Sequence, residues 1–304
     1  MTNVAFAVPE DTVIIADGGL ATELQAHGAD LADPLWSAAL LEREPHRIVA
    51  AHSAFFAAGA QLAITASYQA NYDGFAARGI DRRAADVLLR RSVSLARDAA
   101  TLTGGWVAAS VGPYGAARAD GSEYRGRYGL SVTALTAWHR ARFEVLASAG
   151  ADVLALETVP DIDEAQALVT LAADTDVPAW LSYTIEGAAT RAGQPLPEAF
   201  AVAAGVRQIV AVGVNCCSPA DVLPAIAIAR EVTGKPVIVY PNSGERWHSG
   251  TWSGPALHSA ELAPGWVAAG ARIIGGCCRV RPADIAALAT AIGARTGIDA
   301  GSDG

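Results

Sequence analysis

The sequence contains little that would suit the chain to nucleic acid or to a membrane. Its 304 residues carry 22 basic and 31 acidic side chains, which give a formal net charge of −9. A chain without a basic block is poorly suited to phosphate backbones or anionic lipid surfaces. No apolar run approaches the length of about 20 residues that spans a bilayer. Nucleic-acid binding and membrane insertion are therefore not expected.

Export signals and cysteines are also scarce. Residues 1–9 lack the basic start and long apolar core of a secretory signal, so we expect a cytoplasmic protein. The chain has only four cysteines, and in a reducing compartment these are expected to be thiols or metal ligands before disulfides. No linker-like composition divides the chain. Residues 1–296 are predicted to form one domain, and residues 297–304 a disordered tail.

Short apolar runs alternate with segments of helical periodicity along the chain. A buried parallel strand is typically a short, nearly continuous apolar run. Eight such runs are predicted strands, at residues 13–16, 61–66, 106–111, 153–156, 178–183, 209–214, 236–240 and 272–274. Helices are predicted between them, most clearly at residues 45–58, 82–102, 132–149, 162–173, 219–232 and 282–293.

Eight such repeats in one continuous pattern predict an α/β fold, a single (β/α)8 TIM-type barrel. A doubly wound open sheet is the alternative. That fold usually places a Gly-x-Gly-x-x-Gly sequence after its first strand, and this chain has none there.

Polar or reactive residues end nearly every predicted strand. Barrel active sites lie at the carboxyl ends of the strands, so this is where chemically unusual residues are expected. Asp17 ends the first strand and Glu157 the fourth, while Asn215 and Cys216 end the sixth and Cys277 the eighth. The pattern supports both the barrel and a site on this face.

The thiols are the most distinctive of these groups. Cys216 and Cys277 are two strands apart in barrel order, within reach of a shared ion, and soft sulfur ligands favour zinc. Cys277 and Cys278 can share one metal only if the chain leaves strand geometry, a freedom that Gly275-Gly276 would supply. Three thiolates would leave a fourth position open, as in a catalytic zinc site. The alternative is that the cysteines are small buried hydrophobes.

Three segments resemble the signatures of the zinc-dependent homocysteine S-methyltransferases. They are Asp17-Gly18-Gly19, Gly213-Val214-Asn215-Cys216 and Gly275-Gly276-Cys277-Cys278-Arg279. The family includes betaine–homocysteine methyltransferase. Glu157-Thr158-Val159-Pro160 and the segment from Tyr240 to Glu245 look more like its S-methylmethionine-using branch. The resemblance extends from about Val13 to about Leu288.

The resemblance implies a barrel that transfers a methyl group to homocysteine and so forms methionine. It implies one Zn²⁺ ion held by Cys216, Cys277 and Cys278. A coordinated thiol loses its proton, whereas a free thiol with a pKa near 8.5 is mostly protonated at neutral pH. The partners would be homocysteine and a small methyl donor, with no nucleic acid and no membrane. The substrate-binding residues it implies are Asp17, Gly18, Thr65, Glu157, Asn215 and Asn242.

Structural roles are open for several of these residues. Glu157 could pair with an arginine instead of a substrate ammonium, because a buried carboxylate needs a partner. Asp17 could cap the helix that follows it, and Thr65 could simply fill a strand. Cys217 is expected to point away from Cys216 and to pack. Trp247 and Trp252 either form an aromatic wall for a cationic donor or pack a surface loop, and His248 is expected to be a loop residue.

Other activities remain as alternatives. Selenocysteine or another thiol could replace homocysteine, and S-adenosylmethionine or betaine could replace S-methylmethionine. A zinc hydrolase would be expected to place histidine and aspartate ligands at the strand ends, and these are missing. A non-catalytic thiol-binding barrel would have no need of both Asp17 and Glu157. Neither the methyl donor nor the oligomeric state follows from the sequence.

Overall fold

The computed structural model describes residues 6–248, 251–257 and 259–293, without the side chains of residues 246–248 and 251. The tail predicted at residues 297–304 therefore lies outside the described residues. None of the described helices is long and apolar enough to cross a membrane.

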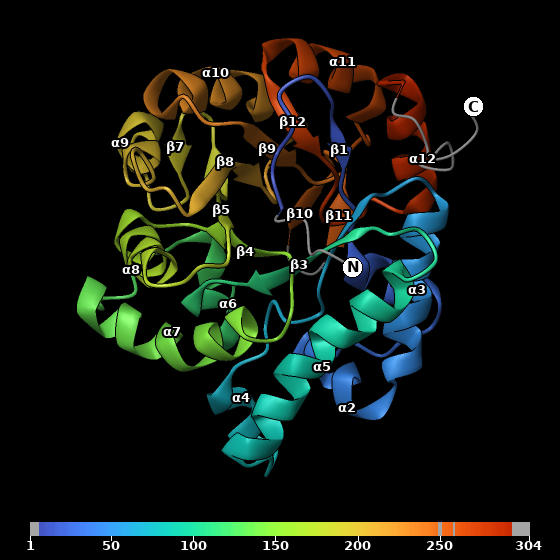
Figure 1. Cartoon of the computed structure of the whole chain (residues 1–304), viewed down its shortest axis with the longest axis vertical. Helices are drawn as coiled ribbons and strands as arrows, with labels where there is room; N and C mark the ends of the chain where they lie inside the picture. Colours follow the sequence, from blue (N-terminus) through green and yellow to red (C-terminus); the bar gives the residue numbers. More distant parts are fainter. Residues whose placement is uncertain (1–5, 249–250, 258, 294–304) are drawn as a thin grey trace, which may run out of the picture.

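Eight parallel strands form one sheet in the order β1-β12-β9-β8-β5-β4-β3-β2. The two ends of this sheet meet, because Ala16 pairs with Leu62 and Gln61 N–H donates to Ile15 O at 2.7 Å. The predicted barrel is therefore confirmed (Figure 1). Its strands are β1 (Ile14–Ile15), β2 (Leu62–Ile64), β3 (Trp106–Val111), β4 (Val153–Val159), β5 (Ala179–Tyr183), β8 (Ile209–Asn215), β9 (Val237–Tyr240) and β12 (Ala271–Ile274).

Helices surround the strands, and two small hairpins lie beside the barrel (Figure 1). The α-helices are α1 (Leu20–Ala26), α2 (Leu40–Arg43), α3 (Pro45–Ala57), α4 (Tyr72–Ala77), α5 (Arg82–Ala100), α6 (Tyr114–Arg118), α7 (Val132–Ala147), α8 (Ile162–Ala173), α9 (Leu196–Ala201), α10 (Val222–Thr233), α11 (Ser259–Ala269) and α12 (Pro282–Ala291). Three short 3₁₀ helices are η1 (Trp36–Ala39), η2 (Ser122–Tyr124) and η3 (Pro219–Asp221). The hairpins pair β6 (Ile185–Glu186) with β7 (Ala189–Thr190), and β10 (Arg246–His248) with β11 (Thr251–Ser253).

Side-chain caps fix the start of several helices. Asp81, Ser131 and Asp161 each accept a hydrogen bond from a backbone N–H in the first turn of α5, α7 and α8 respectively. Such a cap satisfies a donor that the helix leaves free. The helix predicted from residue 219 instead begins with the 3₁₀ turn η3 and becomes α-helical at Val222.

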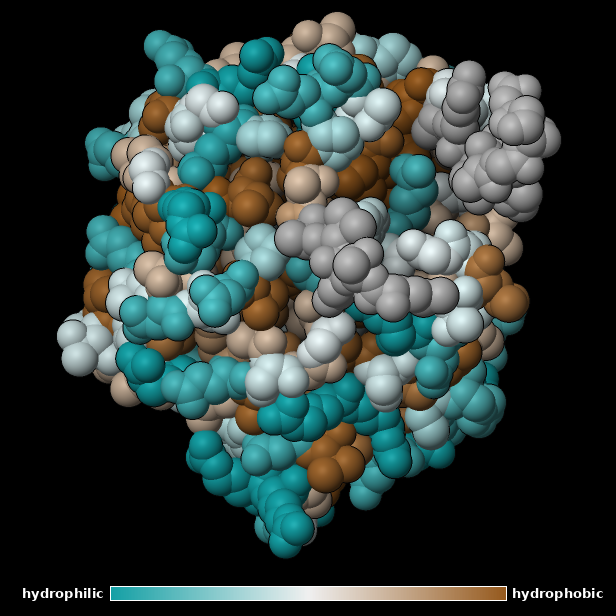
Figure 2. Space-filling view, in the orientation of Figure 1, coloured by the Kyte–Doolittle hydropathy of each residue, from teal (hydrophilic) through white to brown (hydrophobic). Residues whose placement is uncertain are grey.

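The core has two layers. The inner layer fills the barrel with residues such as Ile14, Leu62, Val153, Trp180 and Ile238, while a larger layer lies between strands and helices. The two layers arise because alternate residues of a strand point to opposite faces. Figure 2 shows hydrophilic side chains over much of the outer face, including the tip near α4.

Candidate functional site

A layer of polar side chains covers the inner core at the carboxyl ends of the strands. It follows from the alternation within each strand: Val153 and Ala155 fill the barrel, and the next residue with the same orientation is Glu157. Ser110, Ser182, Asn215 and Tyr240 belong to the same layer. Their hydrogen bonds connect, since Ser110 Oγ donates to Glu157 and Ser182 Oγ lies 2.7 Å from Tyr240 Oη. The barrel thus supports the site with a connected polar network.

Three of the four cysteines meet directly above this layer. Cys216 follows β8, and Cys277 and Cys278 follow β12. Their three Sγ atoms all lie within 4.8 Å of one another. Sulfur ligands of a tetrahedral zinc ion, at about 2.3 Å from the metal, are about 3.8 Å apart. The three thiols therefore form a cluster that can hold a metal ion.

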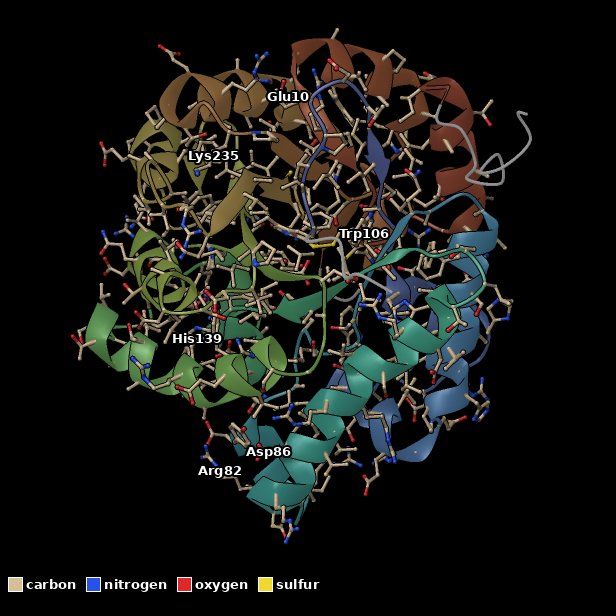
Figure 3. All side chains as sticks on the ribbon, in the orientation of Figure 1. Glu10, Arg82, Asp86, Trp106, His139 and Lys235 are labelled. Atoms are coloured by element: carbon tan, nitrogen blue, oxygen red, sulfur yellow. A yellow bond between two sulfur atoms is a disulfide. The ribbon has the colours of Figure 1, made fainter. Side chains whose placement is uncertain are left out.

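Two of these sulfurs are bonded to each other in the structure, which differs from the expectation of free thiols. Cys216 and Cys277 form a disulfide, with Cα atoms 5.6 Å apart, which Figure 3 shows as a yellow bond near the middle of the barrel. The two residues flank the end of β9, because the Cys216 N–H donates to Tyr240 O and the Cys277 N–H to Pro241 O, so their sulfurs meet. A metal binds thiolates, so the disulfide and metal ligation are mutually exclusive states of this pair.

The other two cysteines differ from each other. Cys217 is part of the hydrophobic core, as predicted, and it lies outside the three-sulfur cluster. Burial raises the pKa of Cys278 to about 11. A buried neutral thiol of this kind is poorly nucleophilic by itself and needs a cation nearby to ionise.

Gly275 and Gly276 were expected to supply backbone angles that other residues avoid, and this expectation was wrong. Neither has a positive φ angle. They are needed for space, because a Cβ on Gly275 would lie 2.7 Å from Asp17 O, and one on Gly276 would overlap the side chain of Val280. The unusual backbone is instead at Cys216, with φ +48°, and at Arg279, with φ +66°.

Glu157 has no arginine partner among the described residues, so that alternative is wrong. Its side chain is 6% exposed and accepts hydrogen bonds from Ser110 Oγ and the Tyr240 hydroxyl. Burial raises its pKa to about 7. A buried carboxylate facing a cavity without a cation is costly in its charged form, so the site favours a cationic ligand.

Asp17 does not cap α1, whose N-cap is Gly19. Its Oδ2 instead accepts the Ile64 N–H at 2.9 Å, and its Oδ1 is buried with no hydrogen-bond partner in the described part of the chain. Burial, with a smaller contribution from the charge of Glu157, holds its pKa well above the usual range. His52 lies 3.8 Å away, but burial lowers the pKa of this imidazole to about 4, so it is neutral at pH 7. Asp17 therefore retains an unsatisfied acceptor.

The remaining predicted residues lie at different depths. Gly18 and Thr65 line the cavity beside the thiols, although Ser67 Oγ and the Ser110 N–H already bond the Thr65 hydroxyl. Asn215 and Asn242 do not line it. Asn215 bonds both the backbone N–H and the hydroxyl of Thr158, and Asn242 Oδ1 accepts the Cys278 N–H at 3.1 Å. Their side chains hold other residues of the site in place.

Aromatic residues that the sequence did not single out line the same cavity, beside Tyr240. They are Trp36, Tyr68 and Tyr124. The Tyr68 and Tyr124 side chains bond Thr158 and Cys278 respectively. A slight signal existed for Tyr68, which closely follows the second strand, but none for Trp36 or Tyr124, which lie in connections. Trp252 is half-buried with the Arg279 guanidinium over its ring, and the Trp247 side chain and His248 side chain are outside the described ones.

A buried charged network contacts the connections that follow β2 and β3, which carry Tyr68 and Tyr124. His139 on α7 points inward (Figure 3) and lies 2.9 Å from Glu164 Oε1, which also accepts the Tyr114 N–H. Arg142 donates to the carbonyl oxygens of Ala70 and Gly112, which follow β2 and β3. Such groups are stable in a core only when paired. The network fixes the connections above the barrel.

These features define a barrel with a cluster of three cysteine sulfurs that can hold a metal ion, two buried carboxylates and an aromatic-lined cavity at the carboxyl ends of its strands. The profile of the homocysteine S-methyltransferase family matches residues 14–292. The chain is 48% identical over 294 residues to homocysteine S-methyltransferase of Escherichia coli, covering 91% of this chain and 94% of that one. It is 40% identical to selenocysteine Se-methyltransferase of Brassica oleracea, covering 90% and 87%.

Solved structures agree. The metallated form of homocysteine methyltransferase MmuM from E. coli superposes with a TM-score of 0.84 at 46% identity, covering 92% of this chain and 96% of that one. The oxidised form of the same protein gives 0.83 at 46% identity, covering 91% and 95%. The chain belongs to the homocysteine S-methyltransferase family, and it is an enzyme of that family.

Proposed function

We propose that this protein transfers a methyl group from a small sulfonium donor, with S-methylmethionine the leading candidate, to homocysteine at a zinc ion held by Cys216, Cys277 and Cys278. The observation that carries the proposal is the convergence of these three thiols beside buried Glu157 and Asp17. Zinc held by these three thiolates would supply acidification of the homocysteine thiol, so that the acceptor sulfur would react as a thiolate.

The protein's own residues orient the acceptor. Glu157 and Asp17 are assigned to its α-ammonium group, because both are buried carboxylates without a charged cationic partner among the described residues, and the charge of Glu157 helps to raise the pKa of Asp17. A cation between them would relieve both costs. Gly18 lets the backbone of Val280 pack closely against it, since a Cβ at position 18 would lie 2.6 Å from Val280 O. Thr65 contributes to the wall, while Asn215 and Asn242 act as positioning residues.

The donor is assigned to the aromatic side of the cavity. Trp36, Tyr68 and Tyr124 line the cavity there, and sulfonium or ammonium groups favour aromatic faces. Transfer to a thiolate removes one positive and one negative charge, so a cavity that excludes water favours the reaction. Holding both substrates in line contributes further, because two molecules must meet.

The reaction is tested with reduced, zinc-loaded protein and homocysteine. Methionine is quantified in parallel with S-methylmethionine, S-adenosylmethionine or betaine, and Cys277→Ala serves as the inactive variant. Methionine formed by the wild type and lost in the variant supports the proposal, and the fastest donor identifies the branch. No methionine with any donor would refute it.

A selenol acceptor is the second candidate, and the Brassica relative favours it. A selenol is more acidic than a thiol and depends less on the metal for its ionisation. Competition between homocysteine and selenocysteine for one donor measures the ratio of their kcat/KM values. A ratio in favour of selenocysteine would assign the protein to that activity.

A further inference from the structure

Two oppositely charged side chains beside Tyr124 have no role in the site described so far. Glu123 precedes Tyr124 in η2, and its Oε2 is buried with no hydrogen-bond partner among the described residues. Gly115 packs directly against the Glu123 backbone, so the segment cannot move away easily. A buried carboxylate oxygen without a partner is costly. Glu123 is therefore poised to accept a hydrogen bond from something outside the chain.

Arg191 contacts the ring of the same tyrosine. It follows β7, and its backbone N–H donates to Thr184 O at 3.2 Å, which fixes its place. Its guanidinium carbon lies 5.8 Å from the centre of the Tyr124 ring, and one terminal nitrogen donates to Glu186 Oε2 at 3.0 Å. Its Nε is buried, and the described part of the chain offers it no acceptor. Arg191 thus has an unused donor facing inward.

The two charges do not satisfy each other. Within the described residues, no ion pair joins Glu123 to Arg191, and the only ionic partner of Arg191 is Glu186, which is 82% exposed. Tyr124, which follows Glu123 in sequence and has the Arg191 guanidinium over its ring, lines the cavity and bonds Cys278, whereas Glu123 and Arg191 lie next to this lining residue and not in the lining itself. The negative charge of Glu123 acts on Tyr68, Tyr124 and Cys278, which places it close to the cavity.

We propose that Glu123 and Arg191 recognise the α-ammonium and α-carboxylate groups of an amino-acid methyl donor. This inference rests on the proposed function and names the substrate class of its donor side. The acceptor's ammonium is assigned to Asp17 and Glu157, which are only 1% and 6% exposed. The Arg191 side chain is 30% exposed and Glu123 is half-buried, so this second pair lies further out, where a second substrate would enter.

The chemistry of the donor matches this placement. In S-methylmethionine the sulfonium sulfur and the carboxylate carbon are about 5 Å apart, four bonds of about 1.5 Å along a zigzag. Such a donor can place its sulfonium against the aromatic rings and its charged end between Glu123 and Arg191. Charge-assisted hydrogen bonds of this kind are the strong ones in a partly buried site.

The test uses four sulfonium donors and two variants of the full-length, zinc-loaded protein. S-methylmethionine carries both charges, 4-(dimethylsulfonio)butanoate only the carboxylate, (3-aminopropyl)dimethylsulfonium only the ammonium, and trimethylsulfonium neither. Glu123→Gln and Arg191→Gln are compared with Glu144→Gln and Arg140→Gln, a matched exposed pair on α7. Donor kcat/KM, donor binding by calorimetry and the KM for homocysteine are measured for each.

We expect Glu123→Gln to lower kcat/KM and affinity about tenfold or more for the two donors with an ammonium group, and to leave the other two unchanged. Arg191→Gln should do the same for the two donors with a carboxylate. The control pair should change nothing, and the KM for homocysteine should stay constant. Equal losses with all four donors, or a raised KM for homocysteine with unchanged donor binding, would overturn the assignment.

The two proposals fail in distinguishable ways. Wild type that forms methionine while both variants bind all donors normally overturns this inference and leaves the proposed function intact. Wild type that forms no methionine refutes the proposed function, and calorimetry with the same four sulfonium compounds still decides whether Glu123 and Arg191 select charged ligands.

Discussion

Replacing Glu157 with glutamine should stabilise the protein at alkaline pH while weakening its hold on homocysteine. Glu157 is almost fully buried, accepts hydrogen bonds from Ser110 and Tyr240, and has its pKa raised by burial to about 7. Glutamine keeps an oxygen that can accept from Ser110 but carries no charge. The substitution therefore separates the cost of burying the charge from the packing of the side chain.

The sign follows from the protons bound in each state. Below about pH 4.5 the carboxyl is protonated in both the folded and the unfolded chain, and its burial as an acid has no electrostatic cost. As the pH rises, the unfolded chain releases the proton first, so folded stability falls until the pH exceeds the folded pKa of about 7. The total loss is about 3 kcal/mol, of which about 2 kcal/mol falls between pH 5.5 and 8.5.

Urea unfolding of reduced wild-type and Glu157→Gln protein at pH 5.5 and 8.5 measures this difference. The variant should gain about 2 kcal/mol relative to wild type between the two conditions. Asp17, whose pKa is also raised, leaves a residual slope in both proteins. The same variant should lose about tenfold to a hundredfold in kcat/KM for homocysteine. Stability that depends on pH in parallel in the two proteins would refute this account of Glu157.

Two further substitutions have matched controls. Cys278→Ala should abolish zinc retention by the reduced protein, measured by atomic spectroscopy after dialysis. Cys217→Ala should keep about one zinc per chain, because Cys217 packs in the core. Loss of zinc from both variants would make Cys217 a ligand. Gly213→Ala should prevent folding, because the added methyl group would overlap the carbonyl oxygen of Ile238. In the control Gly265→Ala in α11, the methyl group meets no atom within 4 Å, so the free energy of unfolding should change by less than about 1 kcal/mol. Thermal melting of the two variants measures the difference.

The barrel could be predicted because the same pattern, an apolar run followed by a helical segment, is repeated along the sequence. Parallel strands buried on both faces read as apolar runs, and β3 and α8 begin and end where the sequence predicted. Strand β4 continues three residues beyond its predicted end at 156. The polar pair Glu157-Thr158 ends the apolar run in the sequence, but it does not end the pairing between the strands. Helix α11 was missed, and it contains Pro264 in its interior, which breaks a helical pattern.

The site was predictable where it coincides with strand ends and not elsewhere. Cys216, Cys277 and Glu157 each end an apolar run, so the barrel brings them together. Tyr124 and Arg191 lie in connections with no periodicity, and their approach to Cys278 and to each other depends on the folded loops. Contacts between side chains of different loops leave no pattern in the sequence.

Backbone strain is concentrated at the cavity beside the cysteines. Trp36, Thr158 and Cys216 line the cavity with φ angles of +50°, +57° and +48°, in a region that bulky and β-branched residues avoid. Each such residue costs about 1–3 kcal/mol and persists only where its surroundings fix it. Asn215 does this for Thr158 through two hydrogen bonds, and the closed barrel does it for Cys216, whose N–H donates to Tyr240 O at 3.3 Å. The rigid barrel therefore holds Thr158 and Cys216, two residues of the cavity wall, in conformations that they would not adopt alone, and this constraint fixes the backbone that carries Glu157 and the Cys216 thiol.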